Sequence, residues 1–269
     1  MFDRSFLPEA RFEFVVVTDT HYMPDPGKQP VEFESRRQQT ARGERALRQI
    51  ASLEAAFVVH LGDVVQAFPD AAGFEQAVSE ALAQLRRCGV HPRLVAGNHD
   101  VGDKPDPTMP TNWVTPGALA AYHARFGRSW YSWEDGGCHF VVLNSQIMNS
   151  ALPEATAHRQ WVESDLAANA GTATFMFLHL APFLHDEDEP GLGHYDNIDQ
   201  PARGWLINLT KSHNVQMLFA GHSHFMFFNR IGAARSFVVP STSFTRPGFS
   251  ELFSSCPPPE RGRNDIAKL

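Results

Sequence analysis

The sequence predicts an α/β fold, and two observations support this prediction. Apolar, β-branched runs typical of buried strands alternate with stretches whose apolar residues recur at helical spacing. This alternation favours parallel strands joined by right-handed helical crossovers. The chain has 269 residues, of which 43% are hydrophobic, so it can build a sizeable core within one domain.

Three strands and two helices are expected in the first hundred residues. The run 12–17 is mostly apolar and β-branched, as expected of a strand buried on both faces. From Phe74 to Leu85, apolar residues form one helical stripe, and Gly89 suits the position just past the end of that helix. In order, the expected elements are strand 12–17, helix 36–53, strand 57–61, helix 72–88 and strand 93–96.

A long loop and a β-hairpin follow. Pro, Asp and Thr dominate residues 102–116, which predicts a loop, and a loop of this length in a compact domain is usually functional or disordered. Gly136-Gly137 separates two strand-like runs and predicts a hairpin. The remaining expected elements are helix 117–126, strands 130–133 and 139–143, helix 156–170, strand 174–178, helix 201–212, strand 215–220, and closing antiparallel strands 225–228 and 236–239.

One domain is the economical division of the chain, because no repeat, low-complexity tract or linker interrupts it. We expect this domain to span residues 1–253. Residues 254–269 contain three consecutive prolines and alternating charges, which predict a polar C-terminal tail, either on the surface or disordered. The acidic stretch 185–199 is expected to be a solvated loop, with a substrate wall at His194 and Tyr195 as the alternative.

Composition narrows the classes of function. With 23 basic and 30 acidic residues the net charge is −7, which argues against a generic binder of nucleic acid or anionic membranes. Apolar runs are too short to span a bilayer, and the N-terminus lacks a signal-peptide pattern, so we expect a cytoplasmic location. Cys88, Cys138 and Cys256 have no C-x-x-C spacing, so neither a disulfide framework nor a thiolate zinc site is expected. We expect Cys88 and Cys138 to be small core residues.

Five expected strands end in a residue that can bind a metal ion. In open α/β sheets, sites form beyond the carboxyl ends of the strands, so these residues have a physical reason to converge. His21 and His224 each lie two positions beyond one of them, and residues so spaced in an extended segment face the same side. The five strand-end residues are Asp19, Asp63, Asn98, His179 and His222.

The types of ligand in this set indicate the class of metal. Imidazole, carboxylate and amide groups without thiolate suit divalent or trivalent ions of manganese, iron, zinc or cobalt. Seven groups exceed the needs of one tetrahedral ion. Two ions about 3.5–4 Å apart that share a carboxylate would use all seven and would form a clamp for displacement at phosphorus.

The order and spacing of these motifs resemble the calcineurin-like metallophosphoesterases. The pattern of that family is D-x-H, G-D, G-N-H-D or G-N-H-E, a lone H, and G-H-x-H. The resemblance covers residues 12–243 and implies a four-layer α/β/β/α sandwich of two mixed β-sheets flanked by helices. The matching residues are Asp19-Thr20-His21, Gly62-Asp63, Gly97-Asn98-His99-Asp100, His179 and Gly221-His222-Ser223-His224.

The resemblance also implies a role for each matching residue. A hydroxide between the two metals would attack phosphorus, because metal binding lowers the pKa of water to about 7. His99 would protonate the leaving oxygen or stabilise its charge, and Asp100 would fix the tautomer of His99. One metal would be held by Asp19, His21, Asp63 and His224, and the other by Asp63, Asn98, His179 and His222, with Asp63 bridging.

Three further stretches resemble one branch, the calcineurin-like phosphoesterase domain-containing proteins of eukaryotes, which are associated with protein phosphatase activity. Purple acid phosphatases and class III cyclic-nucleotide phosphodiesterases share the core motif. The residues after His179 depart from many members, which carry a second histidine there, and this leaves the local substrate contacts open. The three stretches are 62–69, 98–105 and 143–146.

The expected function is therefore hydrolysis of a phosphate ester by a dinuclear metal enzyme. Hydrolysis of a cyclic nucleotide or another phosphodiester, and dephosphorylation of serine or threonine in proteins, are alternatives on the same site. A non-catalytic scaffold would be expected to lack a ligand or His99, and the sequence lacks neither. Trp113 could line the cleft or pack in the core, and Asn144 is interpreted as structural. No role is assigned to His60, His91, His123, His139, His158 or His213.

Overall fold

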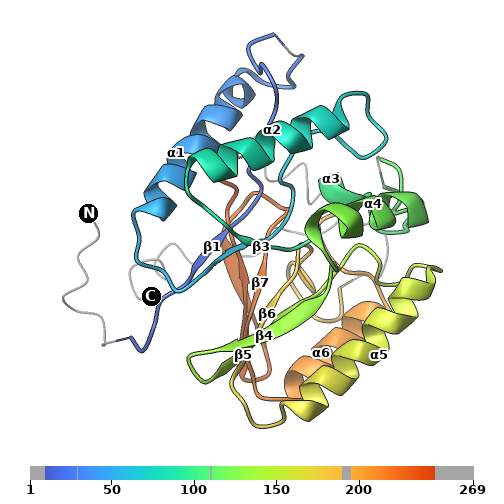
Figure 1. The fold of residues 1–269 in the computed structure, drawn as a ribbon. Helices are drawn as coiled ribbons and strands as arrows, with labels where there is room; N and C mark the ends of the chain where they lie inside the picture. The colour runs from blue at the N-terminus through green and yellow to red at the C-terminus, as the bar shows by residue number, and fades with distance from the viewer. Residues whose placement is uncertain (1–9, 29, 110, 190–194, 246–269) are drawn as a thin grey trace.

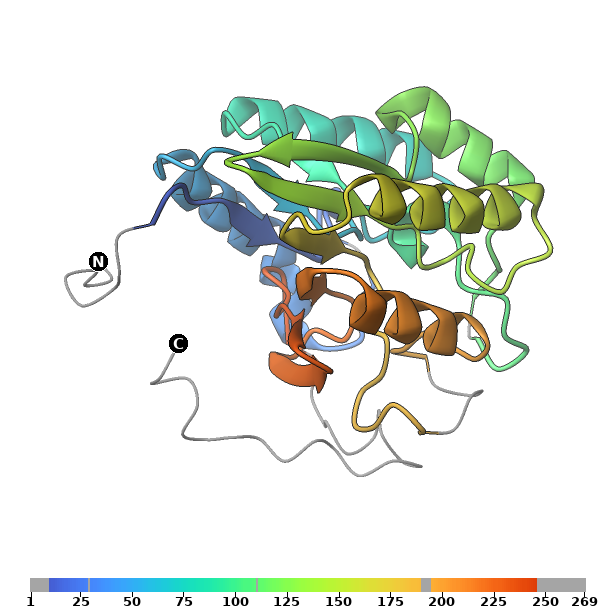
Figure 2. The same ribbon diagram turned by 90° about the horizontal axis from the view of Figure 1, so that it is seen from below.

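Two β-sheets lie face to face between layers of helices in the computed structural model (Figures 1 and 2). The structure describes residues 10–28, 30–109, 111–189 and 195–245. The predicted tail, residues 254–269, lies outside the described residues. Among the described helices, none is long and apolar enough to cross a membrane.

The smaller sheet has three parallel strands in the order β1-β2-β3. These strands are β1 (Val15–Val17), β2 (Val58–His60) and β3 (Arg93–Leu94). The crossovers contain α1 (Gln39–Ala51), preceded by a 3-10 turn at Glu34–Gln38, and α2 (Phe74–Arg87). The predicted parallel strand–helix alternation is confirmed, although each strand is shorter than the apolar run that predicted it.

The larger sheet is mixed and has the strand order β4-β5-β6-β7-β9-β8. Its hairpin pairs β4 (Tyr131–Asp135) with β5 (Cys138–Val142), as predicted, and β6 (Thr174–Phe177) and β7 (Val215–Ala220) extend the sheet in parallel. The closing pair is β8 (Phe227–Ile231) and β9 (Ala234–Val238). Their bounds differ from the prediction because the turn is at Gly232, which has a φ of +61°.

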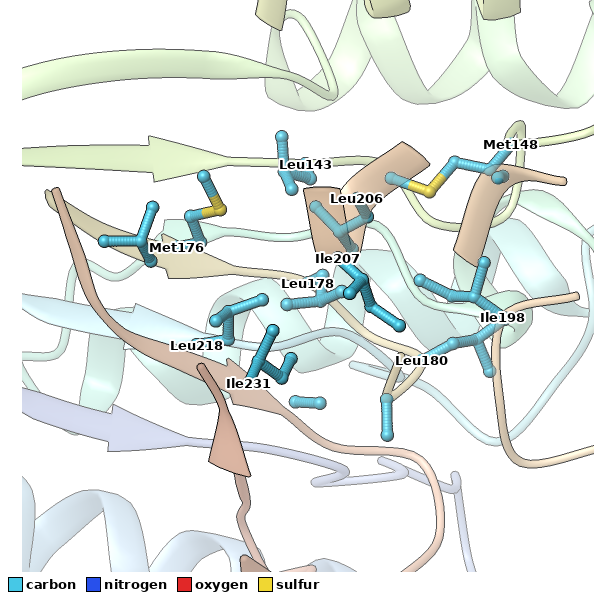
Figure 3. Packing of buried hydrophobic residues seen from close by; sticks show 14 of the residues in the cluster. Leu143, Met148, Met176, Leu178, Leu180, Ile198, Leu206, Ile207, Leu218 and Ile231 are labelled. Atoms are coloured by element: carbon cyan, nitrogen blue, oxygen red, sulfur yellow. The ribbon is translucent and has the colours of Figure 1, made fainter. Parts of the chain in front are cut away.

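The helices of the second half of the chain are α3 (Asn98–Val101), α4 (Pro116–Phe126), α5 (Pro153–Ala168) and α6 (Ala202–Ser212). The outer face of the large sheet packs against α5 and α6, where a cluster of buried aliphatic side chains includes Leu178, Leu206 and Leu218 (Figure 3). The four-layer sandwich implied by the resemblance is therefore confirmed.

Aromatic side chains fill the space between the two sheets. Phe140 and Phe177 of the large sheet pack against Val59 and Leu61 of the small one, and Phe14 contacts Phe140 edge-on. Cys88 is buried against Leu47 beneath the outer helices, as predicted, whereas Cys138 is half-buried at the edge of the inter-sheet core. This packing brings the carboxyl ends of the strands of both sheets next to each other.

Candidate metal centre

The seven side chains expected to bind metal lie together at the carboxyl ends of the strands of both sheets. Asp19 follows β1, Asp63 follows β2, and Asn98 begins α3. His179 follows β6, and His222 follows β7. All seven are almost completely buried, at 2% exposure or less.

The first half-site, as we name it, consists of Asp19, His21, Asp63 and His224. The Nε2 atoms of His21 and His224 are 3.0 Å apart. Oδ1 of Asp19 lies 3.4 Å from Nε2 of His224 and 3.6 Å from Nε2 of His21. Oδ2 of Asp63 lies 3.6 Å from the same nitrogen of His21. These four side chains face one common point.

The second half-site consists of Asp63, Asn98, His179 and His222. Oδ1 of Asn98 lies 3.1 Å from Nε2 of His179 and 3.0 Å from Nδ1 of His222. Those two nitrogens are 3.0 Å apart. Oδ2 of Asp63 is 3.3 Å from Nε2 of His179, so the same oxygen faces both half-sites. A single carboxylate therefore joins the two.

Hydrogen bonds on the far side of three imidazoles aim their lone pairs inward. Nδ1 of His179 donates to the main-chain oxygen of Leu61 at 2.8 Å, and Nδ1 of His224 donates to that of Phe244 at 2.9 Å. Nε2 of His222 donates to the main-chain oxygen of Tyr195 at 3.2 Å. A carbonyl can only accept, so whenever one of these rings is neutral, the nitrogen that faces the site is the unprotonated one.

Asp19 provides an independent test of whether a cation fits. Its Oδ2 accepts bonds from the Thr18 hydroxyl at 2.5 Å and from the amide of His222 at 3.0 Å. Its Oδ1 is buried and has no hydrogen-bond partner in the part of the chain that the structure describes. A buried carboxylate oxygen facing two imidazoles is costly unless a positive charge satisfies it. Ligand distances of about 2.0–2.2 Å would separate neighbouring ligand atoms by about 3.0–3.4 Å, close to the observed spacings.

The backbone is strained where it carries these side chains. Five of the seven described non-glycine residues with positive φ are candidate ligands, with φ values between 43° and 69°. Left-handed backbone is unfavourable for non-glycine residues and is concentrated at functional sites. Close packing also restricts the neighbouring glycines: a Cβ at Gly97 would collide with Oδ1 of Asp63, and one at Gly221 would collide with Thr18. The five residues are Asp19, His21, Asp63, His222 and His224.

Electrostatics show that the site attracts positive charge. Burial lowers the pKa of His179, but the Asp63 carboxylate outweighs burial and raises that pKa to about 9. Burial would raise the pKa of Asp63, but His179 and His99 lower it well below its usual range, so the bridging carboxylate is ionised. Burial and the Asp63 charge raise the pKa of Asp100 to about 7. A cation between the half-sites would satisfy the same attraction.

His99 lies beside the first half-site, oriented by a main-chain group. Its Nδ1 donates to the carbonyl oxygen of Gln66 at 2.6 Å, and its ring stacks on Phe68 with centroids 3.9 Å apart. Its Nε2 lies 4.0 Å from Oδ2 of Asp63. With His21 and Asp63, His99 forms a group close enough to hold a metal ion, so geometry alone admits it as a ligand.

The prediction that Asp100 orients His99 is wrong. Oδ2 of Asp100 accepts bonds from the amides of Asp63 and Gly97 at 2.8 and 2.9 Å, and Oδ1 accepts from Val64 at 3.2 Å. Asp100 thus holds the turn that carries the bridging carboxylate. The position three residues into α3 explains this, because an acidic side chain there reaches back to amides at the start of the helix.

Other residues with open assignments also have clear positions. Tyr195 contacts two ligands of the second half-site, and His194 lies outside the described residues, so the substrate-wall alternative for this loop stays a prediction. Trp113 is 46% exposed and, with Phe68 and Asp100, lines a surface pocket of 230 Å³. His60 is buried under the site and accepts the amide of Gly62 at 3.2 Å, which is a structural role.

Sequence reasoning missed Gln66 and Phe68. Gln66 acts through its carbonyl, which every residue type possesses, so no sequence signal could have revealed it. Phe68 lies in the stretch after Asp63 that carried the resemblance, and its position there is the only signal it offered.

The family model described as calcineurin-like phosphoesterase matches residues 12–226. The chain therefore belongs to the calcineurin-like phosphoesterase family. Among curated proteins, serine/threonine-protein phosphatase CPPED1 of Danio rerio is 32% identical over 176 residues, which cover 62% of this chain and 53% of the relative. The Homo sapiens protein of the same name is 27% identical over 176 residues, with the same coverage. The chain thus spans about half the length of these relatives.

Solved structures share the fold at low sequence identity. A dimetal phosphatase from Danio rerio superposes with a TM-score of 0.61 and 16% identity, covering 89% of this chain and 90% of that one. A purple acid phosphatase from yellow lupin gives a TM-score of 0.58 and 16% identity, covering 90% of this chain and 47% of the other. These similarities establish the fold.

Proposed function

We propose that the chain hydrolyses phosphate esters with two transition-metal ions, chosen from manganese, iron, zinc and cobalt. The observation that carries this proposal is the position of Asp63, whose Oδ2 lies within 3.6 Å of His21 and 3.3 Å of His179. One ion would be held by Asp19, His21, Asp63 and His224, and the other by Asp63, Asn98, His179 and His222. Family membership supports the same chemistry.

The residues around these ligands have separate tasks in this proposal. When bound, the two ions supply positive charge to the phosphoryl oxygens and lower the pKa of water, which can then attack phosphorus. His99 keeps its Nδ1 proton on Gln66, so proton exchange occurs at Nε2. Burial lowers the pKa of His99 to about 3, so the ring is neutral and Nε2 carries no proton at rest. Nε2 would take up the proton that the attacking water releases and pass it to the ester oxygen as the P–O bond breaks. Asp100 acts as a positioning residue for the Asp63 turn.

Alanine at Asp63 tests this function directly. The variant should lose both its bound metal and metal-dependent hydrolysis of a chromogenic phosphate ester, because neither half-site is complete without this carboxylate. Alanine at Asp135, an exposed carboxylate at the end of β4, is the matched control and should leave both unchanged. Wild-type turnover in the Asp63 variant would refute the proposal.

A protein serine/threonine phosphatase is the more specific candidate. The names of the curated relatives, which are 26–32% identical, favour it. Parallel assays with a phosphomonoester, a cyclic nucleotide and a phosphoserine peptide would decide the substrate class. Selective turnover of the cyclic nucleotide would instead establish the phosphodiesterase alternative. A cytoplasmic location stays a prediction of the sequence.

A further inference from the structure

Tyr195 makes three contacts with the second half-site. Nδ2 of Asn98 donates to the Tyr195 hydroxyl at 2.8 Å. Nε2 of His222 donates to the Tyr195 main-chain oxygen at 3.2 Å, and the two rings are 4.5 Å apart between centroids. We propose that Tyr195 is a positioning residue that sets the metal affinity of the second half-site. This inference rests on the proposed metal-dependent function.

The Asn98 contact matters because the two ends of a carboxamide are chemically different. Only the oxygen can bind a metal, and rotation of the amide by half a turn would replace it with an NH₂ group. With Nδ2 bonded to Tyr195, Oδ1 faces His179 and His222. The amide also lies beside the Asp103 carboxyl, which favours the same orientation. The Tyr195 hydroxyl therefore helps to keep the ligand oxygen turned inward.

The segment that presents Tyr195 is anchored by buried polar contacts. Just after it, Nζ of Lys104 donates to the main-chain oxygen of Asn197 at 2.6 Å and pairs with Asp199 at 2.8 Å. The amide of Ile198 bonds to the carbonyl of Ala181 at 2.9 Å, and the Ile198 side chain is part of the core beside α6 (Figure 3). The residues just after Tyr195 are thus held by buried contacts, and such contacts help to preorganise a metal site.

The first half-site obtains its outer hydrogen bonds from other segments. Nδ1 of His224 donates to Phe244, and the Asp19 carboxylate accepts from Thr18. The main-chain oxygen of Asp19 accepts the hydroxyls of Ser241 and Ser243. The Tyr195 hydroxyl bonds to Asn98, which belongs to the second half-site alone, so its loss should act on one ion more than on the other.

Titration of metal-free protein with Co²⁺ tests this inference. Calorimetry gives the two affinities, and the visible absorption of Co²⁺ reports the coordination of each ion. Tyr195→Phe should weaken one ion about 10-fold, the lower end of the effect of losing an outer hydrogen bond, and should leave the other within about 2-fold. Tyr131→Phe is the matched control, because it removes a half-buried hydroxyl that donates to Leu94 at 3.0 Å, and it should leave both affinities unchanged.

A double variant isolates the contact itself. Asn98→Ala removes the amide that bonds to the Tyr195 hydroxyl and makes no new contact there, so adding Tyr195→Phe to it should cost no further affinity. If Tyr195→Phe lowers the metal affinity of that background as much as it lowers that of the wild type, the inference is overturned. The inference also fails if the single variant Tyr195→Phe has unchanged affinities, or if both affinities fall equally. If wild-type protein binds no Co²⁺, the proposed function fails as well. If the wild type and the Tyr195→Phe variant both bind two Co²⁺ ions with the same affinities, only the inference fails.

Discussion

The carbonyl oxygen of Gln66 accepts a hydrogen bond from Nδ1 of His99 at 2.6 Å. This bond fixes the proton of the neutral imidazole at Nδ1 and turns Nε2 toward the bridging carboxylate of Asp63, 4.0 Å away. Phe68 stacks on the ring and restricts its tilt. The group that orients His99 is therefore main chain, and no single side-chain substitution removes it.

Replacing His99 with alanine should separate catalysis from metal binding. Turnover should fall about 10²–10⁴-fold, the usual contribution of a positioned proton donor. Both ions should be retained, because the two half-sites are complete without His99. Turnover and metal content of the same preparation are the measurements. Loss of one ion would show instead that His99 is a ligand, which its distance from His21 and Asp63 permits.

Asp100→Asn should damage the fold of the site and leave the orientation of His99 intact. An amide presents one acceptor atom to three main-chain N–H groups, so at least one buried N–H loses its partner. We expect a loss of about 1–3 kcal/mol in the free energy of unfolding, measured by chemical denaturation. Unchanged stability together with the same loss of turnover as His99→Ala would restore the original interpretation of Asp100.

Gly97→Ala tests how tightly the bridging carboxylate is packed. The added Cβ would collide with both Oδ1 and the main-chain nitrogen of Asp63, so the Asp63 side chain would have to move. Metal affinity should therefore fall at both half-sites, as measured by Co²⁺ titration. Gly117→Ala in α4 is the control: its Cβ would meet only Thr115 at 4.0 Å, and it should be neutral or stabilising by up to about 1 kcal/mol. Equal metal affinities in the two variants would contradict this account.

Much of the fold could be predicted because the ends of strands and the apolar faces of helices are local features of the sequence. The parallel crossovers and the Gly136-Gly137 hairpin follow from periodicity and turn chemistry alone. The predicted bounds of the closing hairpin differ from the observed ones because the sequence pattern does not mark the turn at Gly232. Strands also end earlier than their apolar runs: Val95 and Ala96 are buried beyond β3, where the chain already turns toward Asn98.

The candidate site, too, could be predicted only in part from the sequence. Side chains that could bind metal carry their chemistry in the residue type, so Asp63 and His179 could be proposed from motifs. The groups that orient them could not. Leu61 and Gln66 act through carbonyls, and Asp100 acts on amides that only the fold brings near. Tyr195 is 97 residues from Asn98 in the sequence, and no motif connects the two.

His158 should make the stability of the protein depend on pH. Its side chain is 1% exposed between Trp130 and Trp205, and its Nε2 has no hydrogen-bond partner among the described residues. Burial lowers the pKa of His158 to about 3, whereas in the unfolded chain it is about 6.5. Between these values the unfolded state binds more protons, so the contribution of His158 to stability is complete above pH 6.5 and falls as pH decreases toward 3.

The matched variant is His158→Leu, which keeps an apolar contact with the two tryptophans and cannot take up a proton. Its free energy of unfolding should fall less steeply with decreasing pH than that of the wild type, by up to about 1.4 kcal/mol per pH unit, because one proton is no longer linked to unfolding. Urea denaturation of both proteins at pH 7, 6, 5 and 4, with the same metal content, measures the difference, and effects of all other groups cancel. Parallel curves for the two proteins would show that His158 binds its proton equally well in the folded and unfolded states.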